Sequence, residues 1–283
     1  MFNNDVFKGT KEQYNEKLSI LARIAEDEKW TFEKVKNEMP YKILQNYISF
    51  TYDRLETESK FLISEDGKHM CLNTGLLTEY HQEIVAMFSK YSGKYNYKWY
   101  LIGFFKSSDG KFTSVFNEIP AMANYTKNSR DLIYDKNLKI IVQKEHIIND
   151  NFERFQAAGY NNPQLINALL DDAIKTMELK LARNFKLALP FYYHNTDTGD
   201  SKIQLLAPLY MAGAPVRLAV VLDRRKANED EHYEAITVIP VDWAYMNSRV
   251  IVKPEEEWAK IVDEADSIVA ADIEKNVLTN DEL

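Results

Sequence analysis

The chain has 283 residues, 45% of them hydrophobic and 28% charged, and a formal net charge of −8. These values are typical of a globular protein and exclude a disordered or fibrous chain. No apolar run approaches the roughly 20 residues of a membrane-spanning helix, and the first ten residues lack the pattern of a signal peptide, so we expect a cytoplasmic protein without a membrane partner.

The charge is distributed unevenly along the chain. Residues 254–283 hold ten acidic and two basic side chains, which accounts for the whole net charge of −8. The rest of the chain is therefore neutral overall. This excludes a strongly basic nucleic-acid-binding protein but allows a local basic face. The single cysteine, Cys71, excludes an internal disulfide and a cysteine metal cluster.

Helical patterns occupy the first 59 residues. Thr10 to Gln13 form a capping box ahead of apolar residues at helical spacing, which predicts a first helix. Pro40 opens a longer helix that runs to Leu55 and is apolar on more than one face. Such a helix is buried between other elements or used at an interface, and we favour burial.

Strand patterns begin at Lys60. An Asp66-Gly67 turn between two apolar segments predicts a hairpin, and further strands are expected at 83–88, 99–105 and 138–142. We interpret residues 114–135, which are rich in Asn and Tyr, as an ordered excursion over the surface.

The second half begins with helices and continues with strands. A helix is expected from His146 to Phe155, and Asn162 followed by Pro163 caps a long helix that ends near Leu181. Strands are expected at 203–211, 216–222 and 236–241, with a charged turn at 224–232 and a further strand beginning at 249. The acid-rich helix that starts at Pro254 is amphipathic, with Trp258 through Val269 on its apolar stripe.

These elements predict an α+β fold, in which long helices pack on a mostly antiparallel sheet. An N-terminal helical cap and the C-terminal amphipathic helix complete it. We expect residues 1–59 to be a helical region packed on a main domain of residues 60–283. A separate small domain before Lys60 is the alternative.

Several enzyme classes are excluded by the absence of their motifs. The sequence has no P-loop lysine motif, no dinucleotide-binding glycine motif, no zinc-protease helix motif, no nucleophile elbow and no EF-hand loop. Its five histidines show no metal-ligand spacing, so we predict no metal site and assign no cofactor.

The first candidate site is the segment from His146 to Phe155. On a single helix, Asp150 and Arg154 would follow His146 on one face, with Asn151 beside them. Arg154 would bind phosphate, His146 would act as acid or base, and Asn151 would read a base through its amide. The alternative is that His146 caps the helix and Arg154 pairs with Asp150.

Two further candidate sites follow strand ends. Tyr245 would stack on a base or sugar and Arg249 would bind a phosphate or carboxylate, whereas we favour Asp242 as the cap of a short helix. At Asn73 and Thr74, a turn that continues into Gly75 would hold an anion through its backbone amides and its hydroxyl, with a plain turn as the alternative.

The chain also resembles a known family in segments spread over most of its length after Lys60. They are Asn73-Thr74-Gly75-Leu76, Leu132-Ile133-Tyr134-Asp135, His146 with Asn151 and Arg154-Phe155, Gln204 to Leu209, and Ala244 to Arg249 continuing through Pro254 and Trp258. In these segments the chain resembles an uncharacterised bacterial family of domains of unknown function, found alone or beside cold-shock and LOTUS-type RNA-binding modules. The resemblance implies an association with RNA, although the acidic C-terminal helix departs from that setting.

The leading hypothesis is a cytoplasmic protein that binds a nucleotide or an RNA end, and hydrolysis or modification of that ligand is left open. Asn73, Thr74, His146, Asn151, Arg154, Tyr245 and Arg249 would form the site. The rival hypothesis is a protein-interaction module, such as one used in phage defence, with an aromatic surface and the acidic C-terminal helix as its interface. A third hypothesis is that this helix regulates access to a basic patch on the chain's own sheet.

Overall fold

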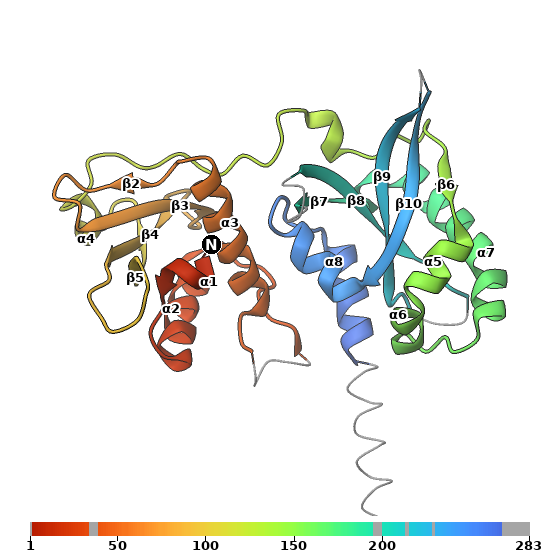
Figure 1. The fold of residues 1–283 in the computed structure, drawn as a ribbon, viewed down its shortest axis with the longest axis horizontal. Coiled ribbons are helices and arrows are strands. Elements are labelled where there is room, and N and C mark those ends of the chain that lie inside the picture. The colour runs from red at the N-terminus through yellow and green to blue at the C-terminus, as the bar shows by residue number, and fades with distance from the viewer. Residues whose placement is uncertain (1, 34–38, 195–199, 213–214, 228–229, 268–283) are drawn as a thin grey trace, which may run out of the picture. The chain divides into compact units, whose positions relative to one another are not determined.

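The computed structural model describes residues 2–33, 39–194, 200–212, 215–227 and 230–267 (Figure 1). The chain folds as two compact units, Met1–Tyr125 (unit 1) and Thr126–Leu283 (unit 2). Each unit is built around its own five-stranded sheet, and helices pack on both sheets, which confirms the α+β class. No helix among the described residues is long and apolar enough to cross a membrane.

The sheet of unit 1 is antiparallel except at one edge, where the short strand β1 runs parallel to β5. Its strands, in spatial order, are β1 (Val6–Phe7), β5 (Trp99–Lys106), β4 (Glu83–Lys90), β3 (His69–Leu77) and β2 (Leu62–Ile63). The expected hairpin joins β2 to β3, and Gly67 at its turn has a φ of +66°.

The helices of unit 1 cover its sheet. They are α1 (Phe2–Asp5), α2 (Lys11–Ile24), α3 (Lys42–Thr57) and α4 (Gly110–Thr113). The capping box at Thr10 is present, which confirms the start of α2. Because α2 contacts β5 and α3 contacts β3, these helices and the strands after Lys60 share one unit. The boundary between units therefore falls at residues 125 and 126 instead of at the expected residues 59 and 60.

A small cluster closes the other face of this sheet. Cys71, Val85 and Met87 project from β3 and β4 and pack against Phe112 and Phe116. Cys71 is fully buried, and this burial raises the pKa of its thiol to about 12. The thiol therefore stays protonated at neutral pH and acts as a small core side chain. A nucleophilic cysteine would instead need to be present as the thiolate.

The sheet of unit 2 is also antiparallel with one parallel edge, here β6 beside β10. Its strands, in spatial order, are β6 (Ile140–Val142), β10 (Asp230–Pro240), β9 (Leu218–Ala227), β8 (Ser201–Leu209) and β7 (Leu189–His194). The sequence suggested that helices pack across one sheet; the structure has two sheets, one in each unit.

The helices of unit 2 lie on both faces of its sheet. They are η2 (Ser129–Leu132), α5 (Lys144–Asp150), α6 (Phe152–Ala157), α7 (Pro163–Arg183), η3 (Phe185–Leu187), α8 (Val241–Ser248) and a helix at 256–267. Figure 1 shows α5 and α7 along one side of the sheet, where their buried residues join one large core with β8, β9 and β10. Asn162 caps α7 as expected, and its side-chain oxygen accepts hydrogen bonds from the backbone of Gln164 and Leu165.

Three predictions for unit 2 are wrong: the turn at 224–232, the strand beginning at 249 and the continuous helix from His146 to Phe155. The charged segment 224–232 continues β9 and β10 up to their connection, because Arg224 pairs with Glu231 across the two strands. Residues 249–251 form a turn after α8 and no strand. The helix expected from His146 to Phe155 is interrupted at Asn151, which separates α5 from α6.

The C-terminal amphipathic helix is confirmed over its described part. Trp258 is fully buried, and its indole N–H donates to the carbonyl of Leu187 at 3.0 Å. Glu256 and Asp263 lie on the exposed face. The expected continuation through Ile268 and Val269 lies outside the described residues.

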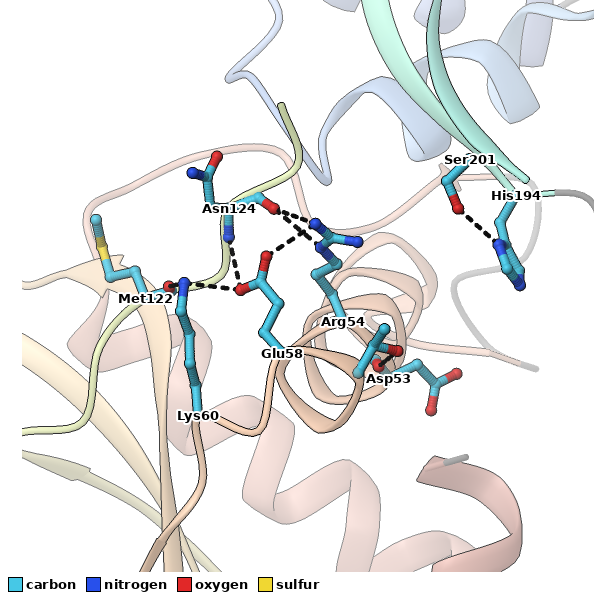
Figure 2. Close-up of polar contacts among 9 residues, drawn as sticks. Asp53, Arg54, Glu58, Lys60, Met122, Asn124, His194 and Ser201 are labelled. Atoms are coloured by element: carbon cyan, nitrogen blue, oxygen red, sulfur yellow. Dashed lines mark hydrogen bonds and ion pairs between the residues drawn. The ribbon is translucent and has the colours of Figure 1, made fainter. Parts of the chain in front are cut away.

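A polar network at the end of α3 holds the segment that precedes the boundary of unit 1 (Figure 2). Arg54 donates from Nε and Nη2 to the carbonyl of Asn124 at 2.9 and 2.7 Å and pairs with Glu58 at 2.9 Å. Lys60 pairs with Glu58 at 2.7 Å and donates to the carbonyl of Met122 at 2.8 Å. The carboxylate of Glu58 also accepts from the backbone N–H of Asn124. Burial opposes ionisation of Glu58, but Lys60, the Asn124 N–H and Arg54 together lower its pKa below the ordinary value of 4.5.

We expect Glu58→Gln to lower the free energy of unfolding of unit 1 by about 1 kcal/mol at neutral pH, because an amide replaces a carboxylate that accepts charged hydrogen bonds near the surface. The pKa of Glu58 is lower in the folded protein than in the unfolded chain. Its contribution to the free energy of unfolding is therefore fully present above about pH 4.5 and is lost as the pH falls through the folded pKa. Urea unfolding of both proteins should therefore show a difference that shrinks in acid. The exposed Glu65→Gln is the control, and an equal difference for Glu58→Gln at both pH values would contradict the assignment.

Candidate nucleic-acid interface

The hairpin that joins β4 to β5 has an unusual composition. Residues 90–98, Lys-Tyr-Ser-Gly-Lys-Tyr-Asn-Tyr-Lys, contain three lysines, three tyrosines and no acidic residue. The N–H of Tyr91 donates to the carbonyl of Lys98 at 3.0 Å and closes the base of the hairpin. Gly93 lies so close to the ring of Tyr91 that a Cβ atom at this position would overlap the phenol. The loop therefore presents its aromatic side chains from a defined backbone.

The adjacent edge strand adds a further ring. Val6 pairs with Trp99 and Phe7 with Tyr100, and the N–H of Lys98 donates to the carbonyl of Asp5 at 2.9 Å. Val6 is 1% exposed, whereas Phe7 is half-buried. Successive side chains of a strand point to opposite sides, so burial of Val6 directs Phe7 towards the hairpin.

Phe7 is the centre of a cluster of aromatic rings. Its ring centroid lies 5.1 Å from that of Tyr91, 5.5 Å from Tyr97, 6.0 Å from Tyr100 and 6.2 Å from Tyr95. These distances fall within the range of attractive aromatic pairs. Tyr95 is nevertheless 68% exposed, so much of one ring remains open to solvent.

Three lysines belong to the same hairpin or contact its rings. The ammonium of Lys17 lies 4.5 Å from the centroid of the Tyr100 ring and donates to the carbonyl of Leu101 at 2.8 Å. Lys94 is exposed, and Lys98 is 68% exposed and lies 3.2 Å from the carboxylate of Asp5. We call the set Phe7, Lys17, Tyr91, Lys94, Tyr95, Tyr97, Lys98 and Tyr100 the aromatic-lysine surface.

This arrangement suits a strand of unpaired nucleotides. An exposed tyrosine offers a flat apolar face on which a base can stack, and neighbouring ammonium groups attract the phosphates. Both kinds of contact tolerate any base sequence, because every base has a flat face and every nucleotide a phosphate. Stacking and ion pairing are binding contacts, so binding is the chemistry that this surface supports.

The site residues predicted from the sequence do not include this surface, although the sequence carries a signal for it. Residues 1–253 have equal numbers of acidic and basic side chains, so nine consecutive residues with three lysines and no acid stand out. Aromatic residues interleaved with lysines are a recognised pattern for binding single-stranded nucleic acids. The contribution of Phe7 has no such signal, because it depends on pairing with a strand more than 90 residues later.

Of the expected site residues, Asn151 and Arg154 are brought together, but by contacts inside unit 2. The Nη1 group of Arg154 donates to the Asn151 side chain at 2.7 Å and to the Thr237 hydroxyl at 3.1 Å. It also donates to the carbonyl of Val238 at 2.6 Å. Asn151 is 4% exposed, and its amide donates to the carbonyl of Ile147. These bonds tie α5 and α6 to β10 at an irregularity in its pairing with β9.

His146 lies apart from that cluster. Its Nδ1 atom is 3.2 Å from the carboxylate of Asp150, and both side chains are more than half exposed. The interruption at Asn151 ends the continuous helical face on which His146 and Arg154 were expected to meet. Arg154 also differs from the alternative interpretation, because its bonds go to Asn151, Thr237 and Val238 instead of Asp150.

Asn73 and Thr74 lie in unit 1, inside β3, and are buried. The Asn73 amide donates to the carbonyl of Pro120 at 3.0 Å, and its oxygen accepts from the N–H of Gly75. Thr74 donates to the carbonyl of Ile84 at 2.6 Å. Gly75 has a φ of +74°, which a bulge in this strand requires. These groups stabilise the irregular strand, and their bonds leave no open anion site there.

Tyr245 and Arg249 both belong to the end of α8. Tyr245 is 3% exposed and Arg249 is 9% exposed, and the N–H of Arg249 donates to the carbonyl of Tyr245. Tyr245 is therefore a core residue in this structure and presents no open face for stacking. Asp242 lies in the first turn of α8 after the capping residue Pro240, so its expected role as the cap is wrong.

Comparison with known proteins identifies one family. The family model described as "Domain of unknown function (DUF3825)" matches residues 21–258. No curated protein and no solved structure matches the chain. Among the described residues, no group of three or more His, Cys, Asp or Glu side chains is arranged to hold a metal ion.

We expect Arg154→Ala to lower the free energy of unfolding of unit 2 by roughly 1–3 kcal/mol, because it leaves the Val238 carbonyl and the Asn151 oxygen without a charged donor. His146→Ala on the exposed face of α5 should change it by less than about 0.5 kcal/mol. Thermal and urea unfolding of the two variants would measure the contrast. If the Arg154→Ala and His146→Ala proteins were equally stable, Arg154 would have no structural role and would remain a candidate for ligand binding.

Proposed function

Since the chain belongs to the DUF3825 family, whose description assigns no activity, we propose a function from its own surfaces: the protein binds single-stranded RNA. The aromatic-lysine surface of unit 1 is the site, and the cytoplasm, where such RNA is available, is the compartment. No cofactor is required for this binding.

One observation carries the proposal. An exposed tyrosine, Tyr95, lies in a cluster of five aromatic rings, three of which belong to a hairpin that contains three lysines and no acid. Tyr95 is 68% exposed within this cluster, so part of its ring is open to a base that stacks on it. The local positive charge also explains how a chain with a net charge of −8 can bind a polyanion.

We expect Tyr95→Ala to weaken the binding of short oligouridine and oligoadenosine by about 5- to 150-fold, which corresponds to the loss of about 1–3 kcal/mol from one stacked base. Lys94→Ala should weaken binding to both sequences and reduce the slope of log affinity against log salt by roughly 0.7. Fluorescence anisotropy with labelled RNA, over a series of salt concentrations, measures both effects.

Tyr80→Ala is the matched control, because Tyr80 is 82% exposed in the same unit but lies outside the aromatic-lysine surface. It should bind RNA as the parent does. The proposal is wrong if folded Tyr95→Ala and Lys94→Ala proteins both keep the affinity and the salt dependence of the parent.

The acidic face of the helix at 256–267 supports a second candidate function, the binding of a basic protein segment. Trp258 anchors this helix to unit 2, and Glu256 and Asp263 remain exposed. Association with a lysine-rich peptide should weaken with salt and with Glu256→Lys combined with Asp263→Lys. Glu118→Lys, an exposed acid of unit 1, is the control, and equal effects of both changes would reject a specific acidic interface.

A further inference from the structure

A pocket of about 410 Å³ in unit 2 combines exposed apolar walls with a basic rim. It is formed by η2 and the residues after it, by the end of α7 with η3, and by β9. Its lining residues are Arg130, Ile133, Tyr134, Asp135, Lys136, Leu181, Ala182, Phe185 and Arg224. Small-molecule sites span about 300–1,000 Å³, so a pocket of this size suits a compact ligand better than a large cofactor.

The floor of the pocket is rigid. Tyr134 is 6% exposed and stacks on the buried Tyr233, with ring centroids 5.2 Å apart and planes inclined by 16°. The Tyr233 hydroxyl accepts from the N–H of Asp135 at 2.9 Å, which holds the lining segment in place. Burial, with a smaller contribution from Glu178, raises the pKa of Tyr134 to about 12, so its phenol is neutral at physiological pH.

The walls are apolar and open. Ile133 is 51% exposed and Phe185 is 50% exposed, and both line the same pocket. Exposed apolar side chains that line one concave site favour a flat, apolar ligand body, because such a body removes apolar surface from water.

The rim is positively charged. Arg224 pairs with Glu231 at 2.5 Å, which lowers the pKa of Glu231 and fixes the guanidinium. Arg130 is 68% exposed and lies 3.9 Å from the same carboxylate, too far for a hydrogen bond. Lys136 is exposed, and the carboxylate of Asp135 accepts from the backbone and the side chain of Asn137. Three basic side chains, Arg130, Lys136 and Arg224, and one acidic side chain, Asp135, thus line the pocket, and the carboxylates of Glu231 and Glu178 lie beside it.

We propose that this pocket binds a nucleoside monophosphate. The base lies against Phe185 and Ile133 over the Tyr134 floor, and the phosphate pairs with Arg130 and Lys136. A guanidinium that is exposed and loosely paired can turn to a phosphate without breaking a tight ion pair, and its fork binds two phosphate oxygens together. A flat ring with one acidic group is the shared chemistry, which an aromatic carboxylate also has. The site is independent of the aromatic-lysine surface.

Isothermal titration of the full chain with AMP, adenosine and indole-3-carboxylate tests the proposal. AMP should bind at least about tenfold more tightly than adenosine, because only AMP carries the group that pairs with the rim. Arg130→Gln should reduce the affinity for AMP by about tenfold and leave that for adenosine unchanged, whereas Phe185→Ala should weaken both.

Lys139→Gln is the matched control, since Lys139 is exposed near the lining segment but does not line the pocket. Tyr95→Ala should retain AMP binding, which separates this test from the RNA proposal. Binding of indole-3-carboxylate without AMP would overturn the nucleotide assignment. Equal affinities of the parent, Arg130→Gln and Phe185→Ala proteins for AMP would overturn the site.

Discussion

Val6 and Phe7 pair in parallel with Trp99 and Tyr100 and extend the first sheet by one strand. The place of Phe7 at the centre of the aromatic-lysine surface depends on this contact. The alternation of a strand sends Val6 into the core and Phe7 outward, and four tyrosine rings then gather around one phenylalanine. A two-residue strand contributes little hydrogen bonding, so the burial of Val6 and of the neighbouring Phe2 must hold it.

Opposite charges organise the second sheet in a comparable way. Asp223 on β9 is 1% exposed, and its carboxylate pairs with Lys202 at 2.6 Å and with Arg225 at 2.7 Å. On the other side of the same strand, Arg224 pairs with Glu231. A buried carboxylate is costly unless cations and hydrogen bonds surround it, and Lys202 of β8 and Arg225 of β9 supply them to Asp223. The charged residues 224–227 and 230–232 therefore belong to β9 and β10, where composition alone suggests a turn.

The polar residues that were predicted to form a ligand site are used instead to stabilise the fold. Asn73, Asn151 and Arg154 make bonds within their own unit, and each bond compensates an irregularity of the backbone. At the bulge, the N–H of Gly75 needs a side-chain acceptor, which Asn73 provides. Near the shift in strand pairing at Thr237, the carbonyl of Val238 needs a donor, which Arg154 provides. Polar side chains at such positions satisfy groups that a regular strand would pair, so their chemistry is used by the fold.

The sequence by itself determined the features whose signals are local: the capping box at Thr10, the Asn162 cap of α7, the Asp66-Gly67 hairpin and the buried stripe of the C-terminal helix up to residue 267. It also determined the α+β class, because hydrophobic periodicity distinguishes helix from strand. Only the tertiary structure decided the partners of Arg154, the boundary at residue 125 and the cluster around Phe7. Arg154 and Val238 are 84 positions apart, and Phe7 lies as far from Tyr91. No local pattern encodes which distant group will satisfy a polar side chain or cover an apolar one.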